Sequence, residues 1–243
     1  MNVGIIIQAR MSSTRLPGKV FKKLAGREML WHVVQRCRRS KKANTVIVAT
    51  STEASDDPIQ QFCVRERIEY CRGDLNNVLK RYTECARKHG LTTIVRVTSD
   101  CPFIDPQIID ETIATFETNN VDFVSNTLHR SFPRGLDAEV FSSEVLNDAL
   151  ANAHSEAEKE HVTPYITSHA KTKPFEVSHE YEGSFRLTVD EQKDYDLAVL
   201  LYEKFFEGDQ SIIDVKQVIN FLHKNPDVAA MNANIQQKAS LIK

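Results

Sequence analysis

The sequence predicts an α/β fold, a doubly wound and mostly parallel sheet of the α/β/α sandwich type, and three observations indicate it. Short apolar runs rich in β-branched residues alternate with amphipathic stretches of helical periodicity. This alternation forms β-α-β-α units, which imply parallel strands. The chain has 243 residues, of which 41% are hydrophobic, so it can bury a sizeable core. We find no repeat, low-complexity tract or linker, and we therefore expect a single domain over residues 1–243.

The first element is the run from Val3 to Ile7, which we predict to be a strand buried on both faces at the centre of the sheet. The alternation after it is regular and gives one topology. In chain order we expect a helix at 28–40, a strand at 45–50, a helix at 58–67, a strand at 68–71, a helix at about 75–89 and a strand at 93–98.

The second half of the chain continues the pattern less regularly. Pro106 begins a further helix, and Ser142 can cap a helix that runs to about residue 153. The tail from Asn225 onward is weakly patterned. The remaining expected elements are strands at 121–125 and around 140–141, two strands within 175–189, and helices at 193–207 and 214–223.

Charge and cysteine content exclude several classes of protein. The 31 Lys and Arg nearly balance 33 Asp and Glu, so no global field favours nucleic acid or an anionic membrane. The cysteines are odd in number and have no C-x-x-C spacing, which argues against a disulfide framework or a zinc site and fits a reducing cytoplasm. The N-terminal MNVGIIIQAR is too short for a signal peptide, and no stretch approaches the ~20 apolar residues that span a bilayer. We expect a soluble, cytoplasmic protein.

Directly after the first strand comes QARMSSTRLPGK, residues 8–19. Ligands of open α/β sheets bind beyond the carboxyl ends of strands, where this loop lies, and guanidinium groups match phosphate oxygens. A solvated basic turn is the alternative. Neither a Walker A motif nor G-x-G-x-x-G is present, so we predict a bound triphosphate rather than a P-loop or a Rossmann dinucleotide site. The loop places three cations around small hydroxyl residues: Arg10, Arg15, Lys19, Ser12, Ser13 and Thr14.

The stretch QARMSSTRLPGKVFKKLAGREML resembles the N-terminal signature of the cytidylyltransferases that activate 3-deoxy-manno-octulosonate and acylneuraminate. Among these enzymes, the chain most resembles the spore coat polysaccharide biosynthesis protein F group. The resemblance implies a nucleotide-diphospho-sugar transferase fold, Mg²⁺ dependence, CTP as donor and often a homodimer. It extends over nearly the whole chain, through RGDLNNVLKRY (72–82), VTSDCPFIDP (97–106), PRGLDAEVF (133–141), KEHVTPYI (159–166) and LTVDEQKDYDL (187–197).

The resemblance also implies roles for individual residues. Arg10, Arg15 and Lys19 would hold the triphosphate, and Asp100 and Asp190 would bind the metal; these five form the predicted catalytic set. The further nucleotide-binding residues would be Ala9, Ser12, Ser13, Thr50, Arg72, Gly73, Asp74, Asn77 and Ser99.

Asp100 and Asp190 each follow an apolar strand pattern, and one or two carboxylates with phosphates and waters suffice to hold Mg²⁺. Each could instead cap a turn or a helix. Their joint occurrence downstream of the basic loop favours the metal. Glycosyltransferases of related fold carry Asp-x-Asp, whereas Ser99-Asp100-Cys101 has a single acid, and this difference weighs against sugar transfer.

The segment PRGLDAEVF is the predicted acceptor side, within a small acceptor-side and dimerisation subregion near 126–185. In the resembling family it faces the sugar, which would put Arg134 on an acid group and Asp137 or Glu139 on hydroxyls. A hairpin with exposed charges is the alternative. His161 is given a minor acceptor role, against a purely structural one. The only other candidate interface for a dimer is the tail from residue 225.

The predicted reaction is direct attack of an acceptor hydroxyl on CTP, with pyrophosphate as leaving group and no covalent enzyme intermediate. Cys101, beside Asp100, is expected to be a small packing residue rather than a nucleophile. The leading hypothesis is a Mg²⁺-dependent cytidylyltransferase for a sugar or sugar acid in surface polysaccharide synthesis. A glycosyltransferase that uses a nucleotide sugar and a non-catalytic nucleotide-binding scaffold are the alternatives. The acceptor itself stays open.

Overall fold

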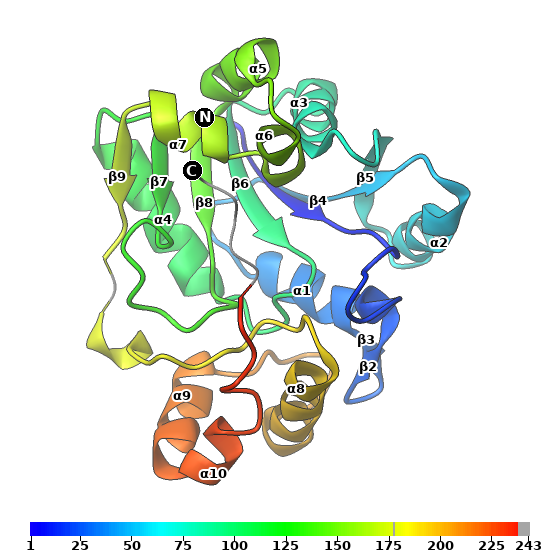
Figure 1. The fold of residues 1–243 in the computed structure, drawn as a ribbon, viewed down its shortest axis with the longest axis vertical. Helices are drawn as coiled ribbons and strands as arrows, with labels where there is room; N and C mark the ends of the chain where they lie inside the picture. Colours follow the sequence, from blue (N-terminus) through cyan, green and yellow to red (C-terminus); the bar gives the residue numbers. More distant parts are fainter. Residues whose placement is uncertain (177, 238–243) are drawn as a thin grey trace.

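The computed structural model describes residues 1–176 and 178–237, through which a seven-stranded sheet runs (Figure 1). β1 pairs in parallel with β4 and β6, β4 with β5 and β7 with β9, whereas β8 is antiparallel to β6 and β7. The expected doubly wound, mostly parallel sheet is confirmed. In sheet order the strands are β5 (Glu69–Gly73), β4 (Thr45–Ser51), β1 (Val3–Gln8), β6 (Thr93–Thr98), β8 (Glu139–Ser142), β7 (Phe123–Ser125) and β9 (Thr172–Pro174).

The first strand lies inside the sheet and is buried on both faces, as predicted. Ile5 and Ile7 belong to one hydrophobic core, whereas Ile6 belongs to a second. Successive side chains of a strand point to opposite faces, so a strand between two cores must be apolar throughout. This requirement explains why an uninterrupted β-branched run, without polar alternation, marked the strand in the sequence.

Helices cover both faces of the sheet. The first core contains buried residues of α1 (Met29–Cys37), α2 (Asp57–Arg65) and α4 (Pro106–Thr118). The second contains residues of α3 (Val78–Lys88) and α5 (Ser143–Asn152). Ser142 caps α5 as predicted, because its Oγ accepts a hydrogen bond from the Val145 N–H at 3.2 Å. The result is the expected three-layer sandwich.

Two short helices between α5 and β9 were not predicted. They are α6 (Glu156–His161) and α7 (Pro164–His169), separated by Val162 with a φ of 71°. The sequence signal for α6 is the capping box of Ser155 and Glu158. The side chain of each residue accepts a hydrogen bond from the main-chain N–H of the other. Pro164 begins α7 rather than interrupting a helix, since proline fits the first turn.

The prediction of two strands within residues 175–189 is wrong. The segment contains a short 3-10 helix, η3 (His179–Tyr181), and Arg186 forms only an isolated bridge with Arg134. Residue 177 lies outside the described part of the chain. The later main chain bonds to a loop, with the Leu187 N–H donating to the Arg134 carbonyl at 2.7 Å. The apolar residues of this segment alternate because they are buried, and not because the segment is a strand of the sheet.

The C-terminal helices lie together at one end of the molecule (Figure 1). They are α8 (Gln192–Phe205), α9 (Val215–Lys224) and the short α10 (Pro226–Ala229), so the two helices expected there are confirmed. Of the tail considered as a dimer interface, residues 238–243 lie outside the described residues. None of the helices in the described ranges has the length and apolar character needed to cross a membrane.

Candidate active site

The loop after β1 is fixed by a buried carboxylate that the sequence analysis did not single out. Asp56 ends the 3-10 helix η2 (Ala54–Asp56), is fully buried, and accepts a hydrogen bond from the Met11 N–H at 2.7 Å. The loop then turns back at Gly18, whose N–H donates to the Met11 carbonyl and whose φ of 66° favours glycine. It leads into the 3-10 helix η1 (Lys19–Phe21), which places a lysine at the base of the loop.

Lys19 joins three segments that are distant in the sequence. Its Nζ lies 2.8 Å from Asp100 Oδ2, 2.9 Å from Asp190 Oδ1 and 2.9 Å from the Val189 carbonyl oxygen. Asp100 follows β6 and Asp190 precedes α8, so both carboxylates are held at the ends of regular elements. The structure therefore brings together the loop lysine and both predicted metal-binding aspartates.

The charges in this cluster are strongly coupled. Burial raises the pKa of Asp100, but the Lys19 ammonium and its hydrogen bond outweigh burial and hold that pKa at about 2. Burial lowers the pKa of Lys19, yet the two aspartates raise it overall. Asp100 and Lys19 are therefore both ionised at neutral pH.

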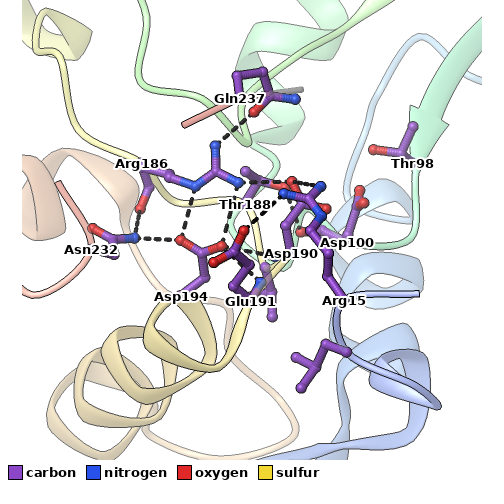
Figure 2. A network of polar contacts seen from close by, with 12 residues as sticks. Arg15, Thr98, Asp100, Arg186, Thr188, Asp190, Glu191, Asp194, Asn232 and Gln237 are labelled. Carbon is purple, nitrogen blue, oxygen red and sulfur yellow. Dashed lines mark hydrogen bonds and ion pairs between the residues drawn. The ribbon is translucent and has the colours of Figure 1, made fainter. Parts of the chain in front are cut away.

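Two guanidinium groups complete the surroundings of Asp190. Arg15 lies 3.0 Å from its Oδ2 and also pairs with Glu191 at 3.3 Å, whereas Arg186 lies 2.7 Å from the same Oδ2. Figure 2 shows Arg15 and Arg186 converging on Asp190 from different segments of the chain. The loop cation Arg15 thus joins the same cluster as Lys19.

A network of polar side chains holds Arg186 in place (Figure 2). Asp194 accepts hydrogen bonds from Arg186 Nε at 2.9 Å and from Asn232 Nδ2 at 2.8 Å. Gln237 accepts a hydrogen bond from Arg186 Nη1 at 2.6 Å. Sequence reasoning missed these four residues. Arg186, Asp190 and Asp194 are four apart around LTVDEQKD, but α8 begins only at Gln192, so this spacing alone does not indicate their contacts, and Asn232 and Gln237 have no local signal.

Neither Asp100 nor Asp190 is a helix cap, which was the alternative for each. Asp105 caps α4 by accepting from the Gln107 N–H at 2.8 Å. Glu191 is the N-cap residue of α8. The helix-cap alternative is therefore wrong for both aspartates, while Asp100 itself lies in the turn that follows β6.

The cluster offers the donor atoms that Mg²⁺ prefers. Asp100 and Asp190 supply carboxylate oxygens, the hard ligands that suit this ion. Asp100 Oδ1 is not used by Lys19 and accepts a weak hydrogen bond from the Cys101 thiol at 3.6 Å. The Asp100 side chain is 24% exposed, so it can be approached from solvent. The two aspartates fit the ion that the resemblance implies.

The predicted nucleoside residues lie along neighbouring strand ends. Thr50 on β4 pairs in register with Arg72 on β5, and its buried hydroxyl has no partner among the described residues. The Arg72 guanidinium donates to the Ser51 carbonyl at 2.7 Å and to the Glu53 carbonyl at 3.0 Å. Gly73 ends β5. Arg72 thus already fastens β5 to the loop after β4.

Asp74 and Asn77 shape the turn from β5 to α3. Asp74 Oδ1 accepts hydrogen bonds from the Asn76 and Asn77 N–H groups at 2.9 Å each, and these bonds lower its pKa. Asn77 caps α3 by accepting from the Lys80 N–H at 2.9 Å. A role in nucleotide binding for these two residues stays a prediction.

The other predicted nucleotide residues lie in or beside the loop after β1. Arg10 pairs with Glu160 of α6 at 3.3 Å, and both side chains are about half exposed. The Ser13 hydroxyl accepts from a loop N–H, and Ser12 is exposed. Ala9 and Ser99, at the ends of β1 and β6, are buried.

The acceptor residues predicted on PRGLDAEVF have separate partners. Glu139 on β8 pairs with Arg96 on β6 at 2.6 Å and accepts from Thr163 Oγ1 at 3.2 Å. Asp137 is held by Arg130 through two bonds of 2.7 and 3.0 Å. Glu139 is therefore a bracing residue of the sheet rather than an exposed charge.

Arg134 and His161 complete the predicted acceptor set. The Arg134 main chain bonds to the segment before Asp190, through the Phe185 carbonyl and the Leu187 N–H. Burial and the charge of nearby Arg130 lower the pKa of its guanidinium. His161, the last residue of α6, is exposed.

This geometry can be compared with known proteins. A family model described as "Cytidylyltransferase" matches residues 4–225. The chain belongs to the cytidylyltransferase family. It is therefore a nucleotidyltransferase, and the family and enzyme class predicted from the sequence are confirmed.

Similar proteins agree with this membership. The spore coat polysaccharide biosynthesis protein SpsF of Bacillus subtilis is 32% identical over 92% of this chain and 95% of its own. A 3-deoxy-manno-octulosonate cytidylyltransferase of Geobacter sulfurreducens is 37% identical over 49% of this chain and 47% of its own. A cytidylyltransferase structure from Leptospira borgpetersenii has a TM-score of 0.87 and 32% identity, over 98% of this chain and 100% of that one.

Proposed function

We propose that this cytidylyltransferase activates a sugar or sugar acid with CTP in a Mg²⁺-dependent reaction that releases pyrophosphate, in the cytoplasm and for surface polysaccharide synthesis. The observation that carries the proposal is the convergence of Lys19, Asp100 and Asp190, with Arg15 beside them. Carboxylates and cations at one strand edge match the needs of a metal-bound triphosphate. The similarity to SpsF supports the pathway.

Within this proposal, Asp100 and Asp190 hold Mg²⁺. The bound ion would supply a positive charge that neutralises phosphate oxygens. Lys19 holds the pKa of Asp100 low and adds a positive charge beside both carboxylates, while Arg186 fixes the orientation of Asp190. Lys19, Arg15 and Arg186 now occupy the two oxygens of Asp190, so Mg²⁺ would replace part of this network when it binds.

Arg10 and Arg15 bind the triphosphate from the loop side. Arg10 now pairs with the half-exposed Glu160, whereas Arg15 pairs with the partly exposed Glu191 and, at 3.0 Å, with the largely buried Asp190. Exposed pairs contribute little stability, so the phosphates can replace the pairs with Glu160 and Glu191 at low cost. A guanidinium group also matches phosphate oxygens in a bidentate way.

The acceptor hydroxyl attacks the α-phosphorus of CTP directly. A new phosphorus–oxygen bond to the acceptor forms, the bond to the bridging oxygen of the β-phosphate breaks, pyrophosphate leaves, and the hydroxyl proton passes to solvent. Burial and the nearby Asp100 charge raise the pKa of the Cys101 thiol, which supports the absence of a covalent enzyme intermediate. Proximity and charge stabilisation would then carry most of the rate enhancement.

Arg134 is proposed to bind an acid group of the acceptor. Arg134 is the member of the predicted acceptor set whose main chain bonds to the segment leading into Asp190. Asp137, Glu139 and His161 are proposed to contact acceptor hydroxyls, although Glu139 also braces the sheet. The chain is proposed to act as one nucleotidyltransferase domain and as a homodimer, with the subregion near 126–185 on the acceptor and dimer side.

The two competing functions predict different products. A glycosyltransferase would release a nucleoside diphosphate, and a scaffold would bind CTP without turnover. Membership in the cytidylyltransferase family favours pyrophosphate release over both. The fold alone would not distinguish them.

The test is pyrophosphate release with Mg²⁺ and each of the four nucleoside triphosphates, against a panel of sugar acids and free sugars. Release confined to CTP and one acceptor is expected. Asp100→Asn and Asp190→Asn should each lower kcat by about 100-fold or more, because each removes a charge that holds the metal. Asp196→Asn is the matched control, since Asp196 is an exposed aspartate on α8. Undiminished rates in both site variants would contradict the metal assignment.

A further inference from the structure

Three metal-ligating side chains meet away from the candidate active site, between β5 and α3. The ligand atoms of Cys71, Cys85 and His89 all lie within 4.8 Å of one another. Cys71 is on the edge strand β5, whereas Cys85 lies in α3 and His89 is the C-cap residue of that helix. Positions four apart on a helix share one face, so Cys85 and His89 approach β5 together. The helix α3 contacts β5 and lies beside this strand (Figure 1).

One ring nitrogen of the histidine in this group lacks a hydrogen-bond partner. His89 Nε2 is buried and has no hydrogen bond among the described residues. Its main chain, by contrast, is well fixed, because its N–H donates to the Cys85 carbonyl at 3.2 Å and its carbonyl accepts from Asn2 Nδ2 at 3.2 Å. A buried polar nitrogen that is held in place without a partner is a position that a ligand would satisfy.

The ligand atoms of Cys71, Cys85 and His89 favour a different class of metal ion from the one that the aspartate cluster favours. Two thiols and an imidazole are the ligands of Zn²⁺ and other thiophilic cations, whereas Mg²⁺ prefers oxygen. With Zn–S bonds of about 2.3 Å and Zn–N bonds of about 2.0 Å, tetrahedral ligand atoms lie roughly 3.3–3.8 Å apart, so inward shifts of about 1 Å would close the site. Three protein ligands leave a fourth position for water. His89 is partly exposed, which gives the ion a path from solvent.

We propose that Cys71, Cys85 and His89 form a binding site for Zn²⁺ or a similar thiophilic divalent cation, which clamps α3 onto β5. The sequence argued against a zinc site because no cysteines have C-x-x-C spacing. The fold removes that objection, since the two thiols come from different elements and meet only in the folded chain. The ion would hold β5 one residue before Arg72, whose guanidinium fastens the same strand to the loop after β4.

The test uses Co²⁺ as a spectroscopic probe of the reduced, chelator-treated full chain, in excess Mg²⁺. The folded wild-type protein should develop a thiolate-to-cobalt charge-transfer band in the near ultraviolet that saturates at one equivalent and disappears when Zn²⁺ is added. His89→Gln and Cys85→Ser should each lose most of this band. Cys63→Ser is the control, because Cys63 is another buried cysteine outside the group and should leave the band unchanged.

A second measurement avoids variants that fail to fold. X-ray absorption of zinc bound to the wild-type chain should give two sulfur neighbours at about 2.3 Å and two nitrogen or oxygen neighbours at about 2.0 Å, the imidazole and the water. The proposal is overturned by any of three results: no band from the folded wild-type chain at one equivalent of Co²⁺, a band that survives both His89→Gln and Cys85→Ser, or zinc surrounded by oxygen and nitrogen alone.

Discussion

Lys19 is the residue on which the geometry of the candidate site depends. One ammonium group lies between two carboxylates that reach it from β6 and from the start of α8. Without that charge, Asp100 would lose the ammonium group that holds its pKa low, and Asp190 would keep only Arg15 and Arg186 as charged partners. The lysine therefore prepares the aspartates to hold a cation, in addition to any contact it makes with phosphate.

Lys19→Gln is expected to lower kcat for pyrophosphate release by about 100-fold or more, because it removes a fixed charge beside the reacting phosphates. The measurement is the steady-state rate at saturating CTP and Mg²⁺, with circular dichroism to confirm folding. Lys23→Gln is the control, since the Lys23 side chain is 56% exposed and pairs with Glu28. Equal rates for the two variants would remove Lys19 from the mechanism.

At the scale of elements, the start of α8 is both a helix terminus and a wall of the site. Asp194 is fully buried and accepts hydrogen bonds from the Asp190 and Glu191 N–H groups at 3.0 Å each. It therefore satisfies two main-chain donors at the helix start and the Arg186 guanidinium at the same time. Its carboxylate couples the stability of α8 to the orientation of Asp190.

Asp194→Asn should lower the free energy of unfolding by about 3 kcal/mol, because it removes one of the two carboxylates that neutralise the buried Arg186. Asp214→Asn is the matched control. Asp214 also caps a helix, α9, by accepting from the Lys216 N–H, but it is exposed, so its substitution should cost about 1 kcal/mol or less. Urea unfolding of the two variants measures the difference, and similar midpoints would show that the buried pair contributes little.

The elements that the sequence predicted well are those whose pattern depends on burial alone. β1 and β4 lie between two cores, so their apolar runs identify them without further information. The segment 175–189 was misassigned because its apolar residues are buried, although its main chain bonds to loops rather than to a strand. The helices α6 and α7 were missed because each is only six residues long, too short for helical periodicity to show.

The residues of the candidate site also differ in how far the sequence could predict them. Lys19 and the two aspartates could be predicted because each lies at a strand end or within a recognisable motif. Arg186 and Asn232 could not, because their importance comes from contacts between segments far apart in the sequence. No local pattern distinguishes an arginine that orients an aspartate from one that is merely exposed.

At the scale of the whole molecule, the C-terminal helices close the first core around α1. His32 on α1 is buried there, with its ring centroid 4.3 Å from that of Tyr202 and 5.0 Å from that of Phe206. Its Nε2 lies 2.7 Å from the Leu24 carbonyl oxygen, so a neutral ring can donate this bond. Burial lowers the pKa of His32 to about 4, against the opposing effect of that hydrogen bond.

This burial makes the stability of the whole chain depend on pH. The unfolded chain binds a proton at His32 below its ordinary pKa of 6.5, whereas the folded chain does so only near 4. Between these values the unfolded state holds more protons, so the free energy of unfolding should fall as the pH decreases from 6.5 to 4, by up to about 3 kcal/mol, and rise again on return to neutral pH. His32→Gln should flatten this part of the profile measured by urea unfolding, whereas His169→Gln, at an exposed position, should leave it intact. If the wild-type and His32→Gln profiles run parallel over this range, the buried ring is not the group that titrates, and the closure of the first core by the C-terminal helices is insensitive to its charge.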